Sequence, residues 1–593
     1  MNAPISTSSL GSPQASDYET HRVLNQADPG SGHNAFSDDL VLTAAIRREA
    51  PWAAERCREL GALAGDEQTQ ELARLANRHL PELRTHDRFG NRIDWVDFHP
   101  SWHQLMTLAW RHEVHSLGWR KGVHQPHYAR AVLSYLWNQV EHGSGCPTGM
   151  AYASYAGFSA EPALRIWAER VLGTEYEFSR REVAHKRSVV VGYAMTEKQG
   201  GSDLRETQTT ATFSHPESYH GATAHWYELR GHKWFCSVPV ADGFFTLAKV
   251  GGGVTCFFLP RTLPDGSFNR FLIQRLKDKC GNKSNASSEI EYAGTLAIRV
   301  GDEGRGIREI LSHAHLTRLD FAVGSAGLMR QALTLALTHT SSRSAFGTSI
   351  AMQPMMANVL ADLAVEVEAA TLLALRVAKA TDHLETSEEE RLLARIATPM
   401  AKFFNCSRAP AVANEALQCH GGNGFVEENQ IARIYREAPL NSVWEGTANM
   451  MCMDVRRAML KDAGTRAAFF DELATCRGMD PRFDAHIVDL QHLVDEACAD
   501  EYLARPMTEA MARALQAAEL LRHSTGEVID TFLGTRLGGA GVSWGSLFGS
   551  IGPGAGKAAG RQAAARIVDR AQVGQYRQAK APETTRYSDS NST

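Results

Sequence analysis

The hydrophobic pattern of this chain changes twice along its length, and these changes limit the folds that it can adopt. From Ser37 to residue 186, apolar residues recur at helical spacing. Between residues 187 and 300, the apolar segments become short and rich in β-branched and aromatic residues, with Gly and Pro between them. Long helical stretches return from residue 301. The order predicts an α+β multidomain fold: an N-terminal helical domain over 37–186, a middle antiparallel β domain over 187–300 and a helical bundle over 301–455.

Individual elements follow from the same patterns. In the β domain we expect strands at Ser188–Met195, Thr209–Phe213, Trp226–Leu229, Phe244–Val250 and Val254–Leu259. In the bundle we expect four long helices, over 305–340, 353–383, 387–418 and 427–461. Residues 456–593 predict a further helical extension, and residues 1–36, rich in Ser, Gly, Pro and Asn, predict a disordered tail.

Charge, hydropathy and cysteine usage exclude several classes of protein. The formal net charge of −5 argues against a protein devoted to coating nucleic acid. Apolar runs stay short of the roughly 18 residues that a membrane helix needs, so no membrane partner is expected. The ten cysteines form no C-x-x-C pair and are interpreted as reduced thiols. Since the first residues also lack a basic and then apolar signal, we expect a cytoplasmic protein.

Histidine spacing does not favour a metal site. His112 and His115 flank a glutamate but stand three apart, one short of the zinc-protease spacing. His99 and His103 are four apart, with no third ligand evident nearby. We therefore expect no bound metal.

Four stretches combine glycine with small hydroxyl residues beside a regular element. They are Met195–Asp203, Gly231–Ser237, Arg343–Gly347, and the pair formed by Gln418–Phe425 with Trp444–Asn449. In this order, and in this arrangement of β domain and bundle, they resemble the acyl-CoA dehydrogenase family of flavoproteins. Further stretches, V-L-N-Q (23–26), F-H-P-S-W-H (98–103), Arg275–Tyr292 and Asn441–Cys452, are similar to the alkylation-response branch of that family.

The resemblance implies bound FAD and removal of an α-proton from an acyl thioester while a hydride passes to the flavin. Glu445 occupies the family's most common position for the carboxylate base. In some members the base lies on the first bundle helix instead, but Thr317 stands at that position here. The resemblance therefore identifies Glu445 as the catalytic residue, although a glutamate at this position could also cap a helix.

The same resemblance implies a set of cofactor contacts. Tyr193 to Thr196 are expected beside the flavin ring, and Ser202 at a position used for the flavin phosphate or the acyl-CoA ligand. Phe235 and Ser237 stand in place of the family's Trp and Thr. Arg343 corresponds to the arginine that pairs with the FAD pyrophosphate of a neighbouring subunit. This sharing implies an oligomer, expected to be a homotetramer. The full predicted set is Tyr193, Met195, Thr196, Ser202, Phe235, Cys236, Ser237, Arg343, Phe346, Gln418, Gly421, Gly422, Trp444, Gly446, Thr447 and Asn449.

The extension exceeds what an ordinary member of the family contains. In the alkylation-response branch the added domain is associated with double-stranded DNA. Residues 557–589 hold seven basic and three acidic residues, a local charge of +4 within a chain of net charge −5. The basic residues that we expect at DNA are Arg456, Arg457, Lys461, Lys557, Arg561, Arg566 and Arg570.

These features predict a flavoprotein that binds duplex DNA and protects it from alkylation, with weak activity toward acyl-CoA. Two alternatives stay open. One is a metabolic acyl-CoA dehydrogenase whose extension serves oligomerisation. The other is an FAD-stabilised scaffold that shields DNA without turnover.

Overall fold

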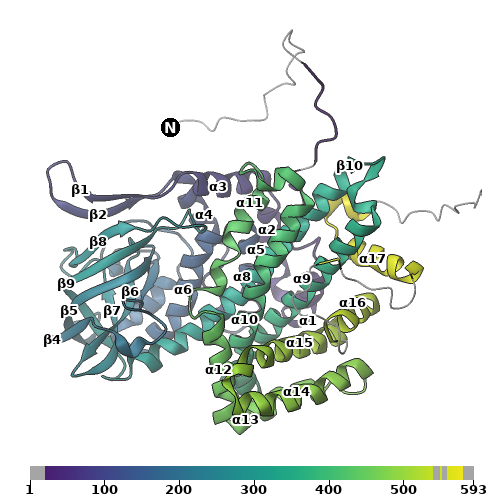
Figure 1. Cartoon of the computed structure of the whole chain (residues 1–593). Coiled ribbons are helices and arrows are strands. Elements are labelled where there is room, and N and C mark those ends of the chain that lie inside the picture. Colours follow the sequence, from purple (N-terminus) through teal and green to yellow (C-terminus); the bar gives the residue numbers. More distant parts are fainter. Residues whose placement is uncertain (1–19, 28, 538–547, 550–556, 579–593) are drawn as a thin grey trace, which may run out of the picture.

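The computed structural model describes residues 20–27, 29–537, 548–549 and 557–578 of the 593-residue chain. It contains the expected layers in the expected order, with the β domain at one end and helices over the rest (Figure 1). Among the described residues, no helix is long and apolar enough to cross a membrane. Part of the expected tail lies against the protein: Ala35 and Phe36 are 4% exposed, and Gly32 donates to the Gly65 carbonyl at 2.8 Å. The tail predicted over 1–36 therefore ends before residue 36.

The N-terminal domain is helical except for one hairpin that the sequence analysis did not predict. Asp87 begins its turn by accepting hydrogen bonds from the backbone N–H groups of Phe89 and Asn91, and Gly90 takes a φ of +86°. The hairpin reaches the β domain, where Asp94 accepts a hydrogen bond from the Ile273 N–H at 3.2 Å. The elements are α1 (Leu40–Glu49), α2 (Ala54–Ala64), α3 (Glu67–Arg78), β1 (Glu82–His86), β2 (Arg92–Asp97), α4 (Pro100–Arg111), α5 (Pro126–Val140), α6 (His142–Ala160) and α7 (Arg165–Val171).

The β domain confirms the five expected strands and adds two. Its strands are β3 (Val191–Ala194), β4 (Thr210–Tyr219), β5 (Ala222–Ser237), β6 (Gly243–Val250), β7 (Gly253–Pro260), β8 (Phe271–Leu276) and β9 (Ser287–Val300). They follow the order β3-β6-β4-β5-β9-β7, and β7 also pairs with β6, so the sheet returns on itself. The domain is not wholly antiparallel as predicted, because β6 pairs in parallel with β3 and β4.

Three long helices form the bundle: α8 (Gly306–Ser342), α9 (Pro354–Asp382) and α10 (Glu388–Cys419). The fourth expected helix, 427–461, is broken into α11 (Gln430–Glu437) and α12 (Ala448–Lys461). Pro439 follows the end of α11, and Glu445 and Gly446 have φ of +53° and +103°, which no helix contains. The break falls on the stretch that carries the predicted catalytic residue.

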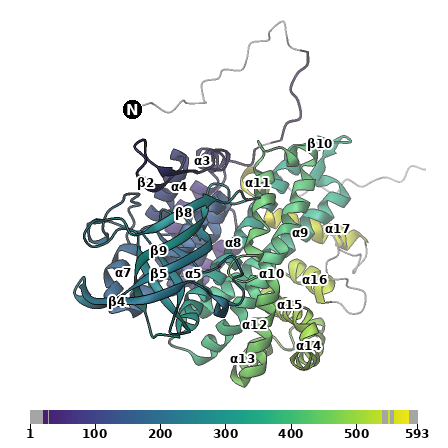
Figure 2. The same cartoon turned by 60° about the vertical axis from the view of Figure 1, so that its left-hand side comes forward.

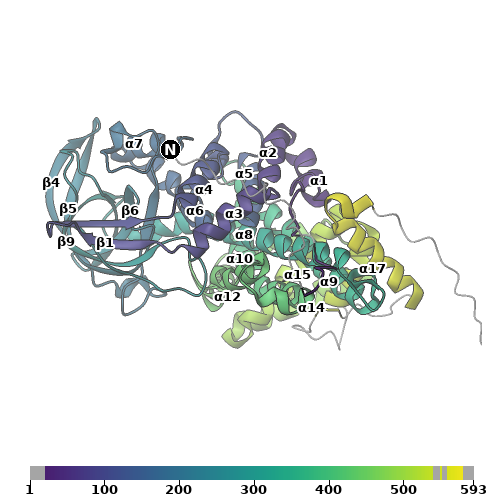
Figure 3. The ribbon, with the colours of Figure 1, turned by 90° about the horizontal axis from the view of Figure 1, so that it is seen from above.

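The extension packs against the bundle rather than standing apart from it (Figures 1 and 2). Its helices are α13 (Ala463–Ala474), α14 (Pro481–Ala499), α15 (Ala504–His523), α16 (Gly526–Phe532) and α17 (Lys557–Ala571). The Gly-rich segment before α17 lies largely outside the described residues. Seen from above, α17 lies beside α9, and α1 is close to both (Figure 3).

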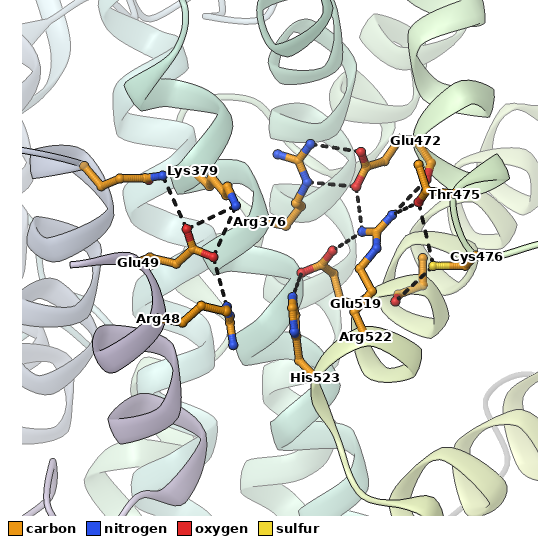
Figure 4. Close-up of polar contacts among 12 residues, drawn as sticks. Arg48, Glu49, Arg376, Lys379, Glu472, Thr475, Cys476, Glu519, Arg522 and His523 are labelled. Carbon is orange, nitrogen blue, oxygen red and sulfur yellow. Dashed lines mark hydrogen bonds and ion pairs between the residues drawn. The ribbon is translucent and has the colours of Figure 1, made fainter. Parts of the chain in front are cut away.

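A network of ion pairs joins the extension to the bundle (Figure 4). Glu472 of α13 receives the guanidinium of Arg376 of α9 at 2.9 Å and that of Arg522 of α15 at 2.7 Å. Arg376 also pairs with Glu390 of α10 at 2.8 Å, and Arg522 with Glu519 at 2.5 Å. One carboxylate thus connects three helices that are distant in sequence.

Candidate active site

The loop between α11 and α12 carries Glu445, and neighbouring helices hold it on both sides. The Trp444 ring stacks on Phe321 of α8 with centroids 4.8 Å apart and planes at 17°. Its indole N–H donates to the Asn441 side-chain oxygen at 3.1 Å. The Asn441 amide in turn donates to the Ser325 hydroxyl and to a ring nitrogen of His142, both at 3.0 Å. The loop is therefore a fixed turn, and its conformation places Glu445 in the left-handed region.

Two buried cations bind the backbone of this turn. Arg318 of α8 donates from Nε to the Glu445 carbonyl at 3.3 Å and pairs through Nη1 with Asp454 of α12 at 3.0 Å. Lys402 of α10 is 0% exposed and donates from Nζ to the Gly446 carbonyl. Buried charges need such partners, so the turn and the cations stabilise each other. The sequence analysis did not identify Lys402, although a lysine inside the apolar run A-K-F-F is the signal that could have done so.

The electrostatics of Glu445 suit a base. Burial raises the pKa of its carboxyl group, and the charges of Arg318 and Lys402 partly oppose the rise. Glu445 as a residue is nevertheless exposed, so the surrounding protein desolvates its carboxyl group without closing it off from solvent. A carboxylate with a raised pKa is a stronger base than an ordinary glutamate, and its accessible surface leaves room for a reacting group.

The charge of Glu445 reaches groups on two other elements, β3 and α6. Burial raises the pKa of Tyr193 on β3 well above its usual range, and the charge of Glu445 adds to the rise. Burial likewise raises the pKa of the Cys146 thiol of α6 to about 12; a hydrogen bond with Ser237 opposes this, and the charge of Glu445 contributes to it. The predicted residue Tyr193 thus lies within reach of the Glu445 charge, and the predicted residue Ser237 bonds Cys146, which the same charge reaches. Cys146 was not predicted, since nothing around it in sequence marks a site.

Thr317 is no alternative base. It is 6% exposed and its hydroxyl donates to the Ala314 carbonyl at 3.0 Å, within its own helix. It immediately precedes Arg318, which contacts the Glu445 backbone, so it lies near the active-site turn as the family position implies.

The expected flavin face of the β domain is built around a buried ion pair. Lys233 on β5 binds Glu197 at 2.7 Å, and Glu197 accepts a further hydrogen bond from Thr209 at 2.6 Å. The carbonyl of Thr196 accepts a hydrogen bond from the Trp234 N–H at 2.7 Å. These bonds hold the loop that contains the predicted residues Met195, Thr196 and Ser202 beside the end of β5.

Side chains alternate across β5, which corrects one predicted contact. The Phe235 ring is 50% exposed on the open face, where a planar ring could stack on it. Cys236 is 0% exposed. Successive residues of a strand point to opposite faces, so the Cys236 side chain points into the sheet, away from Phe235 and Ser237. Only its backbone could contact a ligand on the open face.

The remaining predicted cofactor residues lie at the other end of α8. Arg343 follows the last residue of α8, and Phe346 forms the 98% exposed tip of a small hairpin, β10 (Ser344–Ala345) and β11 (Thr348–Ser349). Gln418, Gly421 and Gly422 are exposed at the end of α10, and the His420 ring there packs at an inclination of 41° against His339 of α8, with centroids 4.5 Å apart.

The length of α8 separates the two groups within one chain. Arg318, whose guanidinium hydrogen-bonds the Glu445 carbonyl, precedes Arg343 by roughly 25 residues along α8, or about 38 Å at 1.5 Å per residue. One chain therefore does not bring Arg343 and Glu445 into a single site.

The last residues of the predicted set begin α12. Thr447 is its N-cap residue, and Gly446 packs against Met451. The Asn449 side-chain oxygen accepts a hydrogen bond from Arg505 of α15 at 2.8 Å. The extension therefore contacts the first turn of α12, just after the turn that carries Glu445, which the sequence did not indicate.

The predicted DNA residues divide into two groups. Arg456 donates to the Ala497 and Cys498 carbonyls at 2.7 and 2.8 Å, Arg566 pairs with Glu527 at 2.7 Å, and Arg570 pairs with Glu368 at 3.0 Å. Arg456 and Arg570 are thus occupied within the fold, which corrects the expectation that they are available to phosphate. Arg457 and Lys461 of α12 and Arg561 of α17 are exposed, and the side chain of Lys557 lies outside the described residues. Figures 1 and 3 show α12 and α17 apart, so these residues do not form one patch.

The residues present fit a flavin dinucleotide. Thr196 packs so closely on Gly201 that a Cβ there would lie 2.3 Å from its hydroxyl, and the half-exposed Phe235 ring stands nearby. At the far end, nothing lies within 4 Å of where side chains at Gly421 and Gly422 would begin. Open backbone of this kind, with an arginine on the neighbouring hairpin, suits a phosphate-bearing ligand.

Comparisons with known proteins agree with this geometry. Residues 25–178 match the N-terminal domain of the adaptive response protein AidB, residues 192–295 the middle domain of acyl-CoA dehydrogenases, and residues 304–460 their C-terminal domain. The chain is 38% identical to AidB of Escherichia coli over 518 residues, which cover 86% of this chain and 93% of AidB. It is 28% identical to acyl-CoA dehydrogenase family member 11 of Caenorhabditis elegans over 82% of this chain and 80% of that relative.

Solved structures share the fold. The C. elegans protein ACDH-11 in complex with C11-CoA superposes with a TM-score of 0.78 at 24% identity, over 88% of this chain and 93% of that one. A Bacillus anthracis acyl-CoA dehydrogenase complexed with FAD gives 0.63 at 16% identity, over 93% and 90%. With its Glu445 turn, its β domain and these matches, the chain belongs to the acyl-CoA dehydrogenase family of FAD-dependent oxidoreductases, in the branch of AidB.

Proposed function

We propose that this protein oxidises the Cα–Cβ bond of an acyl thioester, with Glu445 as the base. The observation that carries the proposal is the left-handed turn at Glu445, which two buried cations hold while burial raises the pKa of its carboxyl group. A base that is fixed in place and stronger than usual is what removal of a weakly acidic α-proton requires.

The reaction balances with residues that are present. The Glu445 carboxylate takes the α-proton, and a hydride leaves the β-carbon as the Cα–Cβ double bond forms. Bound FAD supplies the hydride acceptor at its N5 atom. Arg318 and Lys402 hold the turn through its carbonyl groups. Their positive charges also limit the rise in the pKa of the Glu445 carboxyl group. The stacked rings of Trp444 and Phe321 present apolar surface beside the turn, which would help to exclude water once a substrate is bound.

The substrate class that we propose is an acyl-CoA. The relative ACDH-11 was solved with C11-CoA, which supports a medium or long acyl chain. The test is anaerobic bleaching of the bound flavin by straight-chain acyl-CoAs. Glu445→Gln, which keeps the shape but removes the base, should slow bleaching about 10²–10⁴-fold while the flavin stays bound. The exposed Glu428→Gln is the matched control. Bleaching at the normal rate in Glu445→Gln would refute the proposed role.

We also propose that two subunits share each cofactor and that the assembly is a homotetramer. The separation of about 38 Å along α8 supports sharing, because Arg343 of one chain would serve a site whose base belongs to another. The unpaired state of all ten cysteines supports a reducing compartment, so we place the protein in the cytoplasm.

A second proposed function is binding of double-stranded DNA and protection from alkylation. It is supported by the likeness to AidB and by two exposed basic residues, Arg457 and Lys461, four apart on α12. Non-specific contacts of this kind reach phosphates, so binding should weaken as salt rises. This function leaves open whether DNA is shielded with or without turnover at the flavin.

Point variants test the DNA proposal. Arg457→Ala with Lys461→Ala should lower the slope of log affinity against log salt by about 1 for each lost phosphate contact. Arg456→Ala is the control, since its guanidinium bonds α14 carbonyls; it should cost stability and leave the salt slope unchanged. Unchanged binding in the double variant would remove α12 from the interface. If wild-type protein shows no salt-sensitive DNA binding, the extension serves oligomerisation and the metabolic alternative holds.

A further inference from the structure

The segment Val23–Gln26, which the motifs of the family branch singled out, lies against the hairpin β10–β11. The Asn25 side-chain amide donates to the Ser344 carbonyl at 2.8 Å, and its oxygen accepts from the Ser344 N–H at 2.8 Å. One side chain thus satisfies both backbone groups of the first hairpin residue, as a neighbouring strand would.

The backbone of Asn25 makes a third bond to the same place. Its carbonyl accepts from Nη1 of Arg343 at 2.8 Å. Asn25 has a φ of +55°, a left-handed conformation that asparagine tolerates better than most residues. This conformation lets the side chain and the carbonyl act on adjacent residues of the hairpin.

Few other contacts fix this part of the hairpin. Its strands have two residues each, and its tip, Phe346, is 98% exposed. The Arg343 carbonyl accepts a hydrogen bond from the Ile350 N–H at 2.9 Å, but this bond fixes the backbone and not the guanidinium. Among the described residues, the Asn25 carbonyl accepts the one hydrogen bond that the Arg343 guanidinium donates, which leaves its other N–H groups available to a ligand.

We propose that Asn25 is a positioning residue for the cofactor site of a neighbouring subunit. It sets the direction of the Arg343 guanidinium, so that the remaining N–H groups reach the FAD pyrophosphate as a preorganised fork. The proposal rests on the proposed sharing of FAD between subunits. It assigns to the N-terminal segment a role in cofactor retention that is separate from the chemistry at Glu445.

The test measures FAD binding to the full-length apoprotein by flavin fluorescence, with the melting temperature of the apoprotein recorded alongside. Asn25→Ala removes two hydrogen bonds and frees the third, so FAD should bind about 10-fold more weakly. The apoprotein melting temperature and the bleaching rate at saturating FAD should not change. Gln26→Ala is the matched control, because this neighbouring side chain donates only to the nearby Leu24 carbonyl at 3.0 Å.

Arg343→Ala separates the two ideas. It should weaken FAD at least as much as Asn25→Ala, and the double variant should bind FAD no more weakly than Arg343→Ala alone, since Asn25 acts through Arg343. Normal FAD binding in Arg343→Ala would overturn the shared site itself. Three outcomes would each overturn the role of Asn25. The first is weak FAD binding in Arg343→Ala with normal binding in Asn25→Ala. The others are equal losses of FAD affinity in Asn25→Ala and Gln26→Ala, and additive losses in the double variant.

Discussion

Replacing Glu472 by glutamine should loosen the extension from the bundle. Burial by itself would raise the pKa of this carboxyl group, but hydrogen bonds and charges from Arg376 and Arg522 outweigh burial and lower the pKa to about 2 from its ordinary 4.5. Each pKa unit corresponds to about 1.36 kcal/mol, so the charged form contributes about 3 kcal/mol at neutral pH. The side chain is 14% exposed, so solvent screens little of this energy. Glutamine keeps the size of the side chain but removes the negative charge that Arg376 and Arg522 share.

The pH dependence gives this prediction its sharpest form. A carboxyl group whose folded pKa is lowered stabilises the fold above its unfolded pKa, and the stabilisation is lost as pH falls. The difference between wild type and Glu472→Gln should therefore be constant above pH 5, shrink below 4.5 and vanish near 2.

Hydrogen exchange of the α13 and α15 amides measures the local opening directly. A change of about 3 kcal/mol corresponds to roughly 100-fold faster exchange through opening. The surface pair of Glu388 with Arg391, whose glutamate is 62% exposed, provides the control, since Glu388→Gln should change exchange less than about 3-fold. If Glu472→Gln accelerates exchange no more than Glu388→Gln does, the ion-pair network does not stabilise the extension. If Glu472→Gln accelerates exchange equally at pH 3 and pH 7, the charge of Glu472 is not the source of the stabilisation.

Two further changes test the active-site turn. Lys402→Met removes a charge that lowers the pKa of Glu445, so the acid limb of the bleaching rate should move to higher pH; an unmoved limb contradicts the electrostatic role of Lys402. Arg505→Ala removes the hydrogen bond to Asn449 and should weaken FAD binding by less than about 10-fold, measured by flavin fluorescence, without changing the pH profile; a shifted profile would place Arg505 at the chemistry instead.

The sequence was sufficient for the order of domains, because the period of hydrophobic residues is a local signal. The catalytic role of Glu445 follows from the resemblance to the family and stays a prediction. It was insufficient for Lys402 and Cys146, because their roles arise when α10 and α6 meet the turn before α12, far away in sequence. The broken fourth helix shows the same limit. Its apolar spacing continues through Glu445, and only the tertiary contacts of the turn show why the chain leaves the helix there.

Charge patterns were the least reliable guide, and the basic residues show why. Arg456 and Arg457 are adjacent and indistinguishable by type, yet one caps the carbonyl end of α14 and the other is exposed. On a helix, neighbouring residues point about 100° apart, so one faces the fold and the next faces solvent. Local charge thus indicates where partners are needed without telling whether the partner is a carbonyl, a carboxylate or a phosphate.

The contacts of α12 also decide how the extension must be studied. This helix begins two residues after Gly446 and carries Asp454, which pairs with Arg318 and, at 2.8 Å, with Arg395. It is therefore part of the active site as well as the start of the extension. Removing residues 456–593 would shorten α12, uncover the faces of α9 and α10 that pack against α13, α15 and α17, and leave Arg376 without its partner Glu472. A loss of DNA binding in such a truncation would follow from a damaged bundle alone, whereas variants of exposed residues on an intact α12 separate DNA contact from folding.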